Sequence, residues 1–365
     1  MKMVTVFKMK MKLLIIGDKK RFLHLEKFAS ELQRSNIETK IIYDLEFIDK
    51  FFEFNLQKKM NKKKKFDDVL RIFEPDLVLL DRITKIGKKI IEKDIPFYIL
   101  LRGNYWEEVS WAKNTIYRSK IEKMRVKENE KNFDYCMKNA KMILPISKYL
   151  KEITIEKYPD KKIKILAADG RDPNEWKNFG DSKLKHPNVG LLQGLNIWGK
   201  SRELLTLKKV LQEMPDVTFY FAGDGIYRDK ILPDLQEFEN FVWLRELENP
   251  EKVKEYLTEV DIFLFLTGLE GLGQSIIEAA LMKKPIIASD TGGVRDLIKD
   301  DVNGFLINQG EHKKIVKLIK NFINNPDLSN DMGERAYNSV KQKFDWKNIA
   351  KEFVEIIQED GFLKN

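Results

Sequence analysis

Residues 261–293 read DIFLFLTGLEGLGQSIIEAALMKKPIIASDTGG, and this stretch decides the fold. Residues 262–266 are an apolar run with the length expected of a strand that is buried on both faces. Glycines follow at once, then residues 274–282 predict a helix and residues 285–289 a second buried strand. A strand, a glycine loop, a helix and a strand make a parallel crossover unit, which places a ligand site at the carboxyl end of its first strand. Glycines let backbone N–H groups approach a ligand closely, and the helix N-terminus behind them favours an anion.

Two carboxylates make this unit more than a generic phosphate loop. Glu270 lies in the glycine loop, and Glu278 lies inside the predicted helix among apolar neighbours. An ionised carboxylate in such surroundings needs partners, because burying it unpaired is costly or forces it to become neutral. The hydroxyl groups of a sugar ring would satisfy Glu278. A structural lysine partner, or a role as cap of a neighbouring helix, is the alternative, and the sequence leaves both interpretations open.

Length and composition describe a two-domain protein with a heavily charged surface. A chain of 365 residues exceeds what one hydrophobic core usually supports, and 34% of its residues are charged. No apolar run approaches the roughly 18 residues of a membrane helix. The single cysteine, Cys136, rules out an internal disulfide, and with three histidines no metal site is predicted. The first residues do not resemble a signal peptide, both Met1 and Met11 are plausible starts, and we expect a cytoplasmic protein.

Part of the net charge of +9 comes from the run KKMNKKKK between Lys58 and Lys65. Such a run is usually a solvated face. Attraction to anionic lipid headgroups is the functional alternative, which would place the protein peripherally at the inner face of the membrane. We expect no nucleic-acid partner, because the lysines are not interleaved with aromatic residues and no helix-turn-helix, zinc or RNA-binding motif occurs.

The first half of the chain alternates strands with helices. Residues 22–35 are a predicted helix, and the predicted strands are residues 12–17, 39–43, 77–80, 97–101 and 142–144. This alternation is typical of an α/β fold with a doubly wound parallel sheet. Gly17 ends the first strand without the rest of a G-x-G-x-x-G fingerprint, which argues against a dehydrogenase.

A turn-rich segment separates the two halves of the chain. Residues 169–176 read DGRDPNEW, and a polar stretch follows to residue 188. We therefore predict one domain over residues 1–180 and a second over residues 181–346.

The glycine loop also resembles a known family. The Glu-x7-Glu spacing of Glu270 and Glu278, with Gly271 and Gly273 between them, resembles the signature of the retaining glycosyltransferases of the GT4 family, the glycosyl transferases group 1. The continuation PIIASDTGG, residues 285–293, is similar to the same family.

The resemblance implies an architecture. It is strongest over residues 189–307 and implies the GT-B fold, in which two Rossmann-like, doubly wound parallel-sheet domains face a cleft. In that fold residues 1–180 would form the acceptor side and residues 181–346 would bind the nucleotide-sugar donor. A last helix within residues 347–365 would pack back on the first domain.

By resemblance, Glu278 would hold the ribose hydroxyls of the donor, Lys200 its diphosphate, and Glu270 the transferred sugar. Where this chain has Leu195 the family usually has an arginine that also serves the diphosphate. We expect Arg202 or a residue of the first domain to replace it. The other predicted donor contacts are Gly17, Gly271, Gly273, Gln274 and Ser275, with Leu244 and Arg245 at the nucleobase. Residues 223–225, GDG, are interpreted as a structural turn.

Arg102 stands at a strand end where many members of the family carry a histidine that faces the acceptor. A guanidinium there would clamp an anionic acceptor or a phosphate. The alternative is a structural ion pair with Glu107 or Glu108. Arg102, Lys200 and Glu270 are therefore the candidate catalytic residues.

The resemblance implies retaining, metal-independent transfer of a hexose-type sugar to a glycan, a lipid-linked acceptor or a small molecule. The donor would be UDP- or GDP-linked, and no cofactor is expected beside it. No D-x-D motif, which holds a metal-bound diphosphate in the other glycosyltransferase fold, occurs in the sequence. Two alternatives stay open: a nucleotide-sugar epimerase of the same fold, and a non-catalytic relative that binds a glycan or a lipid.

Overall fold

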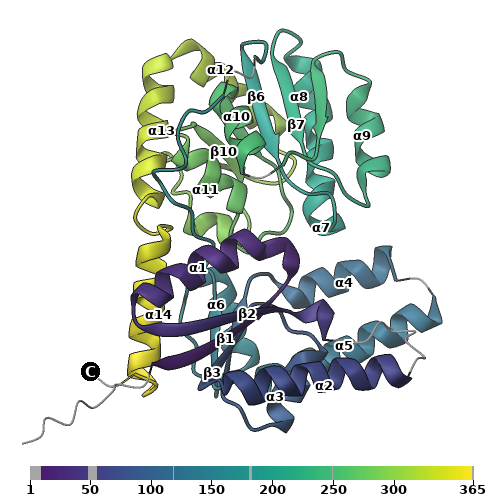
Figure 1. Cartoon of the computed structure of the whole chain (residues 1–365). Helices are drawn as coiled ribbons and strands as arrows, with labels where there is room; N and C mark the ends of the chain where they lie inside the picture. Colours follow the sequence, from purple (N-terminus) through teal and green to yellow (C-terminus); the bar gives the residue numbers. More distant parts are fainter. Residues whose placement is uncertain (1–9, 48–55, 118, 181–182, 249, 364–365) are drawn as a thin grey trace, which may run out of the picture.

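The computed structural model describes residues 10–47, 56–117, 119–180, 183–248 and 250–363. Its strands form a five-stranded sheet of order β2-β1-β3-β4-β5 and a six-stranded sheet of order β11-β10-β9-β6-β7-β8 (Figure 1). Neighbouring strands pair in parallel in both sheets. The prediction of two doubly wound parallel-sheet domains is confirmed.

Four strands of the first sheet are apolar with buried central residues, whereas its edge strand β2 is partly exposed. Its strands are β1 (Met11–Gly17), β2 (Ile37–Tyr43), β3 (Leu77–Leu80), β4 (Phe97–Leu101) and β5 (Met142–Pro145). Its helices are α1 (Phe22–Arg34), α2 (Leu56–Phe73), α3 (Lys85–Glu92), α4 (Tyr105–Thr115), α5 (Lys120–Asn139) and α6 (Lys148–Lys157).

The second sheet has the same layered construction. Its strands are β6 (Asn188–Leu192), β7 (Thr218–Ala222), β8 (Phe241–Arg245), β9 (Ile262–Phe265), β10 (Ile286–Ser289) and β11 (Phe305–Ile307). Its helices are α7 (Trp198–Ser201), α8 (Leu207–Glu213), α9 (Arg228–Gln236), α10 (Glu251–Glu259), α11 (Gln274–Leu281), α12 (His312–Asn324) and α13 (Pro326–Val340). None of the helices within the described ranges is long and apolar enough to span a bilayer.

The strand orders show where a ligand belongs. The order reverses between β1 and β3 in the first sheet and between β6 and β9 in the second. In open parallel sheets ligands bind outside the carboxyl ends of the strands at such a switch point. The loops that follow β1, β3, β6 and β9 are therefore the places to look for a site.

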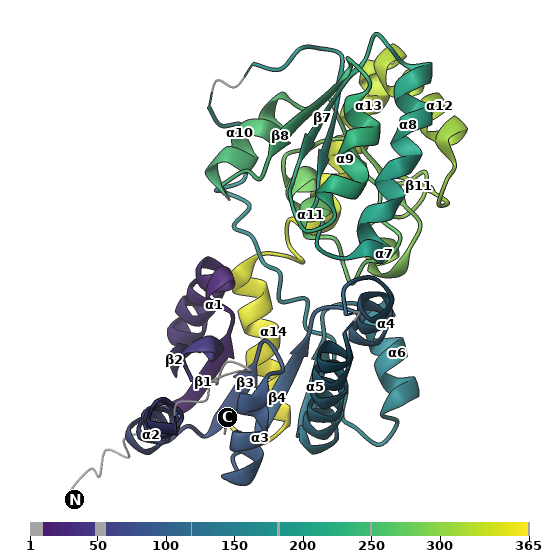
Figure 2. The ribbon, with the colours of Figure 1, turned by 90° about the vertical axis from the view of Figure 1, so that its right-hand side faces the viewer.

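The last helix, α14 (Trp346–Glu359), leaves the second domain and lies beside α1 of the first (Figures 1 and 2). Its Phe353 packs edge-on against Phe28, with ring centroids 5.5 Å apart. Just beyond the helix, Asp360 accepts a 2.6 Å hydrogen bond from the Tyr98 hydroxyl of β4. α14 and the residues directly after it thus pack against the first domain. The domain division at residue 180 stays a proposal, because residues 181 and 182 lie outside the described residues.

We expect Phe353→Ala to lower the free energy of unfolding by about 3–5 kcal/mol, the usual loss when a buried phenylalanine is truncated. Phe353 is fully buried between α1 and the first sheet. Urea denaturation followed by tryptophan fluorescence measures the change. Lys351→Ala, an exposed position on the same helix, is the control and should stay within about 0.5 kcal/mol of the unmodified protein. Equal losses in both variants would contradict the packing of α14 described above.

Candidate active site between the two sheets

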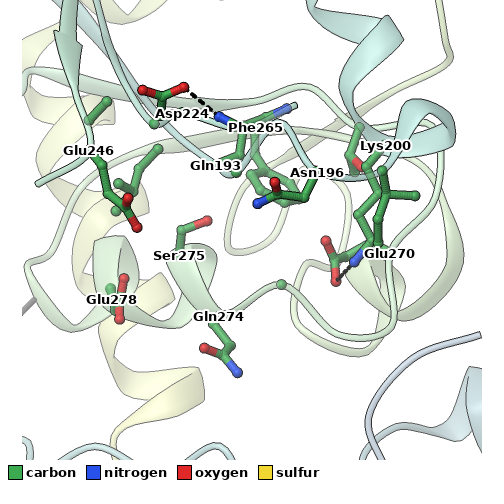
Figure 3. Close-up of a pocket in the computed structure, with 18 of the residues that line it drawn as sticks. Gln193, Asn196, Lys200, Asp224, Glu246, Phe265, Glu270, Gln274, Ser275 and Glu278 are labelled. Atoms are coloured by element: carbon green, nitrogen blue, oxygen red, sulfur yellow. Dashed lines mark hydrogen bonds and ion pairs between the residues drawn. The ribbon is translucent and has the colours of Figure 1, made fainter. Parts of the chain in front are cut away.

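A cavity of about 1000 Å³ lies between the carboxyl ends of the two sheets. The second domain lines it with residues that follow β6, β7, β8 and β9, and the first domain adds residues that follow β1 and β4. Figure 3 shows Lys200 and Glu270 on one side of the cavity and Glu246 and Glu278 on the other. The cavity therefore occupies the switch point of the second sheet.

The glycine loop between β9 and α11 forms the wall of the cavity next to the first domain. Gly273 has φ +105°, which a residue with a Cβ rarely adopts, and it directly precedes α11. A Cβ on Gly271 would come within 2.5 Å of the carbonyl oxygen of Arg102, so this loop passes close to the first domain. The Gly293 N–H donates a 3.0 Å hydrogen bond to the carbonyl oxygen of Glu270, which ties the loop to the turn after β10.

Lys200 places a cation beside this loop. Its Nζ lies 3.4 Å from Oε1 of Glu270 and 3.8 Å from Oε1 of Glu108, a residue of α4 in the first domain. Burial alone would lower the pKa of Lys200, but the two carboxylates outweigh it and raise that pKa. Glu270 also accepts a 2.9 Å hydrogen bond from the Gly271 N–H. A charged ammonium group and a carboxylate are thus fixed together at the mouth between the domains.

Arg102 lines the cavity, but neither Glu107 nor Glu108 is its partner, so that alternative is wrong. Its guanidinium donates to Asp81 at 2.6 Å through Nε and to Asp169 at 2.6 Å through NH1. Both acids are buried. Asp81 directly follows β3 and Asp169 lies in the interdomain segment, and from these positions they approach Arg102 more closely than the glutamates of α4 do.

Asp169 joins the two domains. Its Oδ1 accepts hydrogen bonds from Arg102, from Arg21 at 2.8 Å and from Gln274, the first residue of α11, at 2.7 Å. Burial alone would raise the pKa of Asp169; Arg102 and Arg21 outweigh burial and lower that pKa well below its ordinary value. The carboxylate therefore stays ionised and fixes the first turn of α11 to the first domain.

Glu278 has a protein partner, and this partner is an arginine instead of the lysine considered as the alternative. Arg171 donates to Oε1 of Glu278 from Nε at 3.1 Å and from NH2 at 2.5 Å. Both side chains are buried, with 5% and 4% of their surface exposed. The interdomain turn, which the sequence identified only as a linker, brings in the guanidinium. Glu278 still lines the cavity, so the ion pair positions it there.

Comparison with known proteins agrees with this geometry. A family model described as "Glycosyl transferases group 1" matches residues 200–339. Residues 200–339 thus resemble the glycosyl transferases group 1 family. The match covers the lysine, the glycine loop and Glu278, and we refer to residues 200–339 as the group 1 region.

Relatives extend the likeness beyond the group 1 region. An uncharacterized glycosyltransferase of Methanocaldococcus jannaschii is 26% identical over 237 residues, which are 62% of this chain and 62% of that protein. The sulfoquinovosyl transferase SQD2 of Arabidopsis thaliana is 28% identical over 152 residues, 41% of this chain and 29% of that protein. The chain thus spans less than two thirds of the length of either relative.

Solved structures match nearly the whole chain. Sucrose-phosphate synthase of Thermosynechococcus elongatus has a TM-score of 0.77 at 13% identity, covering 96% of this chain and 98% of that one. HepE of Anabaena in complex with UDP-glucose has a TM-score of 0.70 at 17% identity, covering 96% and 100%. At such low identity the likeness shows the fold alone, and that fold is GT-B.

The group 1 region and the first domain bring most of the predicted site residues together. Those that line the cavity are Arg102, Lys200, Glu270, Gly273, Gln274, Ser275 and Glu278. Those that do not line it are Gly17, Gly271, Arg202, Leu244 and Arg245. Gly17 faces Leu25 and Asp81 of its own domain, and Gly271 backs onto Arg102 instead of the cavity.

Arg202 does not replace the arginine that is absent at Leu195. Its guanidinium lies over the Trp111 ring, 4.6 Å from the centroid, and Leu195 is fully buried. Lys20 and Arg21, which follow β1, line the cavity instead. The basic run directly after the first predicted strand was the sequence signal for them, since it stands at the carboxyl edge of the sheet.

The GDG turn, which the sequence analysis interprets as structural, also lines the cavity. Gly223, Asp224 and Gly225 all contribute, and the Asp224 carboxylate accepts the N–H of Gly225 at 2.6 Å. The turn follows β7, and this alone could have predicted the placement because the carboxyl ends of parallel strands share one edge.

The lowered pKa of His24 should make the free energy of unfolding depend on pH in the acid range. Burial first, and the neighbouring Arg171 second, lower the pKa of His24 to about 2 from an ordinary value of 6.5. A pKa lowered by folding gives stability that is complete above pH 6.5 and is lost as pH falls towards the folded value. Between pH 7 and pH 5 the unmodified protein should therefore lose about 2 kcal/mol more than His24→Gln. Urea denaturation at several pH values measures this; parallel curves for the two proteins would contradict a neutral His24.

Proposed function

We propose that the protein is a glycosyltransferase that takes a hexose-type sugar from a nucleoside diphosphate. One observation supports this above all. The cavity at the switch point of the second sheet gathers Lys200, the N-terminus of α11 and Glu270 against the first domain. A diphosphate fits such a place, because a helix N-terminus and a lysine both favour negative charge. The UDP-glucose complex of HepE supports the donor class.

The same groups would also stabilise the charge that develops during the reaction. As the sugar leaves, negative charge grows on the diphosphate, and donors that are already oriented stabilise it without reorganising. Lys200 and the amides at the start of α11 would do this, so we propose that transfer needs neither a metal nor a cofactor. Glu270, paired with Lys200 at 3.4 Å, would contact the transferred sugar. Retention of configuration is proposed from the family likeness.

The two domains have different proposed roles. The second binds the donor, while the first presents a glycan, a lipid-linked molecule or a small molecule as acceptor to the face where Arg102 and Glu108 lie. Interdomain hydrogen bonds such as Gln274 to Asp169 would hold the domains together over the donor and exclude water.

Peripheral contact with an anionic membrane is proposed for the lysines of α2. Lys63, Lys64 and Lys65 are exposed on this helix, although Lys65 also lies 3.0 Å from Glu46. Flotation with vesicles that contain anionic lipid measures the contact. We expect binding that falls with salt and with replacement of the lysines by glutamine. Equal flotation of both proteins would refute it.

A panel of sugars linked to UDP, GDP or ADP, incubated with the protein in the presence of EDTA, tests the function. A glycosyltransferase is expected to release free sugar slowly from one donor when no acceptor is present. An altered but still linked sugar would instead identify an epimerase, and no turnover of any donor would favour a non-catalytic relative. Activity that disappears with EDTA and returns with a divalent cation would refute metal independence.

A further inference from the structure

Glu246 lies at the end of the cavity farthest from the diphosphate side. In the second sheet β8 is the edge strand, two places from β6, whose following loop leads to Lys200. At the spacing of parallel strands this separation is roughly 10 Å, about the length of a nucleoside. Figure 3 shows the Glu246 carboxylate pointing to the side of the cavity that Ser275 and Glu278 line. With Glu278 at the ribose, Glu246 stands where the nucleobase would lie.

The backbone explains why Glu246, and not the predicted Leu244 and Arg245, reaches the cavity. The pairing of β7 with β8 shifts register after Phe221, so that Ala222 pairs with Arg245 and Leu244 is skipped. Arg245 then adopts a φ of +63°, and its carbonyl accepts a 2.8 Å hydrogen bond from the Gly223 N–H. A bulge followed by a left-handed residue turns the chain out of the strand. The next side chain therefore faces the ligand space.

The neighbouring cation does not neutralise Glu246. The Arg245 guanidinium lies over the Trp243 ring, 5.0 Å from its centroid. Within the described part of the chain, no hydrogen bond or ion pair holds the Glu246 carboxylate. The cavity thus presents an acceptor carboxylate at its nucleobase end, beside the apolar side chains of Leu247 and Val253.

We propose that Glu246 selects a guanine nucleotide, so that the donor is a sugar linked to guanosine diphosphate. A carboxylate accepts hydrogen bonds through two oxygens and donates none. Guanine offers two adjacent donors on one edge, the ring N1–H and the exocyclic N2 amino group. Uracil offers a single N–H between two carbonyl oxygens, which a carboxylate repels. This inference rests on the proposed function and adds the base to it.

The UDP complexes of similar structures do not decide the base for this chain. HepE, which binds UDP-glucose, is 17% identical. Identity at that level fixes the course of the backbone but not the side chain at one position. The side chain present here is an acid, and it is the chemistry of that acid that favours guanine.

Calorimetric titration of the full chain with GDP, IDP and UDP tests the proposal, because hypoxanthine, the base of IDP, is guanine without the N2 amino group. Loss of a hydrogen bond to a charged group is worth roughly a factor of 10 to 100 in affinity. We expect GDP to bind at least about tenfold more tightly than IDP and UDP. In Glu246→Gln the GDP affinity should fall at least about tenfold, and the ratio of GDP to IDP affinity should approach one. Glu248→Gln, an exposed acid that does not line the cavity, is the matched control and should behave as the unmodified protein.

The outcomes separate two failures. Binding of UDP as tight as that of GDP, or a GDP to IDP ratio that survives in Glu246→Gln, would overturn the assignment of the base and leave the glycosyltransferase proposal standing. Failure of all three nucleotides to bind would overturn the assignment of the base, and failure of ADP as well would overturn both proposals.

Discussion

Lys200→Met is expected to lower the turnover number roughly 100- to 1000-fold, the usual effect of removing one preorganised group that stabilises developing negative charge. Lys200 is the cation held at the glycine loop, 3.4 Å from Glu270. Its loss leaves the diphosphate with the amides of α11 and the cations of the first domain. Sugar transfer or donor hydrolysis under saturating donor measures the change, which should appear in kcat more than in KM.

A matched control separates this effect from a general loss of positive charge. Lys208 is exposed and forms only distant ion pairs, 3.5 and 3.8 Å from two surface acids. Lys208→Met should leave turnover unchanged within about twofold, since exposed charges contribute little. Turnover of Lys200→Met within a few fold of the unmodified protein, with the same KM, would remove Lys200 from the reaction.

Arg171→Met is expected to lower the stability of the protein by about 3–5 kcal/mol, because it leaves the Glu278 carboxylate buried without its guanidinium. Glu278→Met should cost a similar amount for the converse reason. The double variant should be more stable than either single variant by at least about 2 kcal/mol, since replacing both members of a buried pair is often neutral. Denaturation without nucleotide measures all three.

The donor affinity of the same variants gives a second readout. Because Glu278 lines the cavity, the double variant should regain stability without regaining nucleotide binding. Additive losses in the double variant would contradict a buried Arg171–Glu278 pair, and restored nucleotide binding would remove Glu278 from the site.

Local patterns predicted the part of the site that one segment builds. The structure has β9, a loop and α11 where the sequence predicts a buried strand, a glycine loop and a helix. These features could be predicted because each depends on residues that are neighbours in the sequence. The same holds for the strands of the first domain, where the predicted ends differ from the observed ones by a few residues.

The parts that the sequence missed depend on contacts between distant segments. Arg171 and Glu278 are 107 positions apart, and nothing near Glu278 indicates that an arginine of the interdomain turn reaches it. Arg102 likewise meets Asp81 and Asp169 instead of the acids that follow it in the chain. Leu244 and Arg245 do not line the cavity, because a register shift in β8 brings Glu246 to it instead. A bulge changes which side chain faces a ligand without leaving a clear residue pattern.

Titration calorimetry with GDP and with UDP, on the unmodified chain and on a variant whose cavity is blocked, tests most directly whether this cavity holds a nucleotide. Gly194 lines the cavity, and a Cβ there would lie no closer than 3.5 Å to its nearest neighbour, Asn196, so Gly194→Leu should fold and occupy ligand space. We predict that the unmodified chain binds one equivalent of at least one of the two nucleotides, and that Gly194→Leu, with an unchanged melting temperature, binds at least about tenfold more weakly. Binding of neither nucleotide, or equal binding by both proteins, would contradict the account.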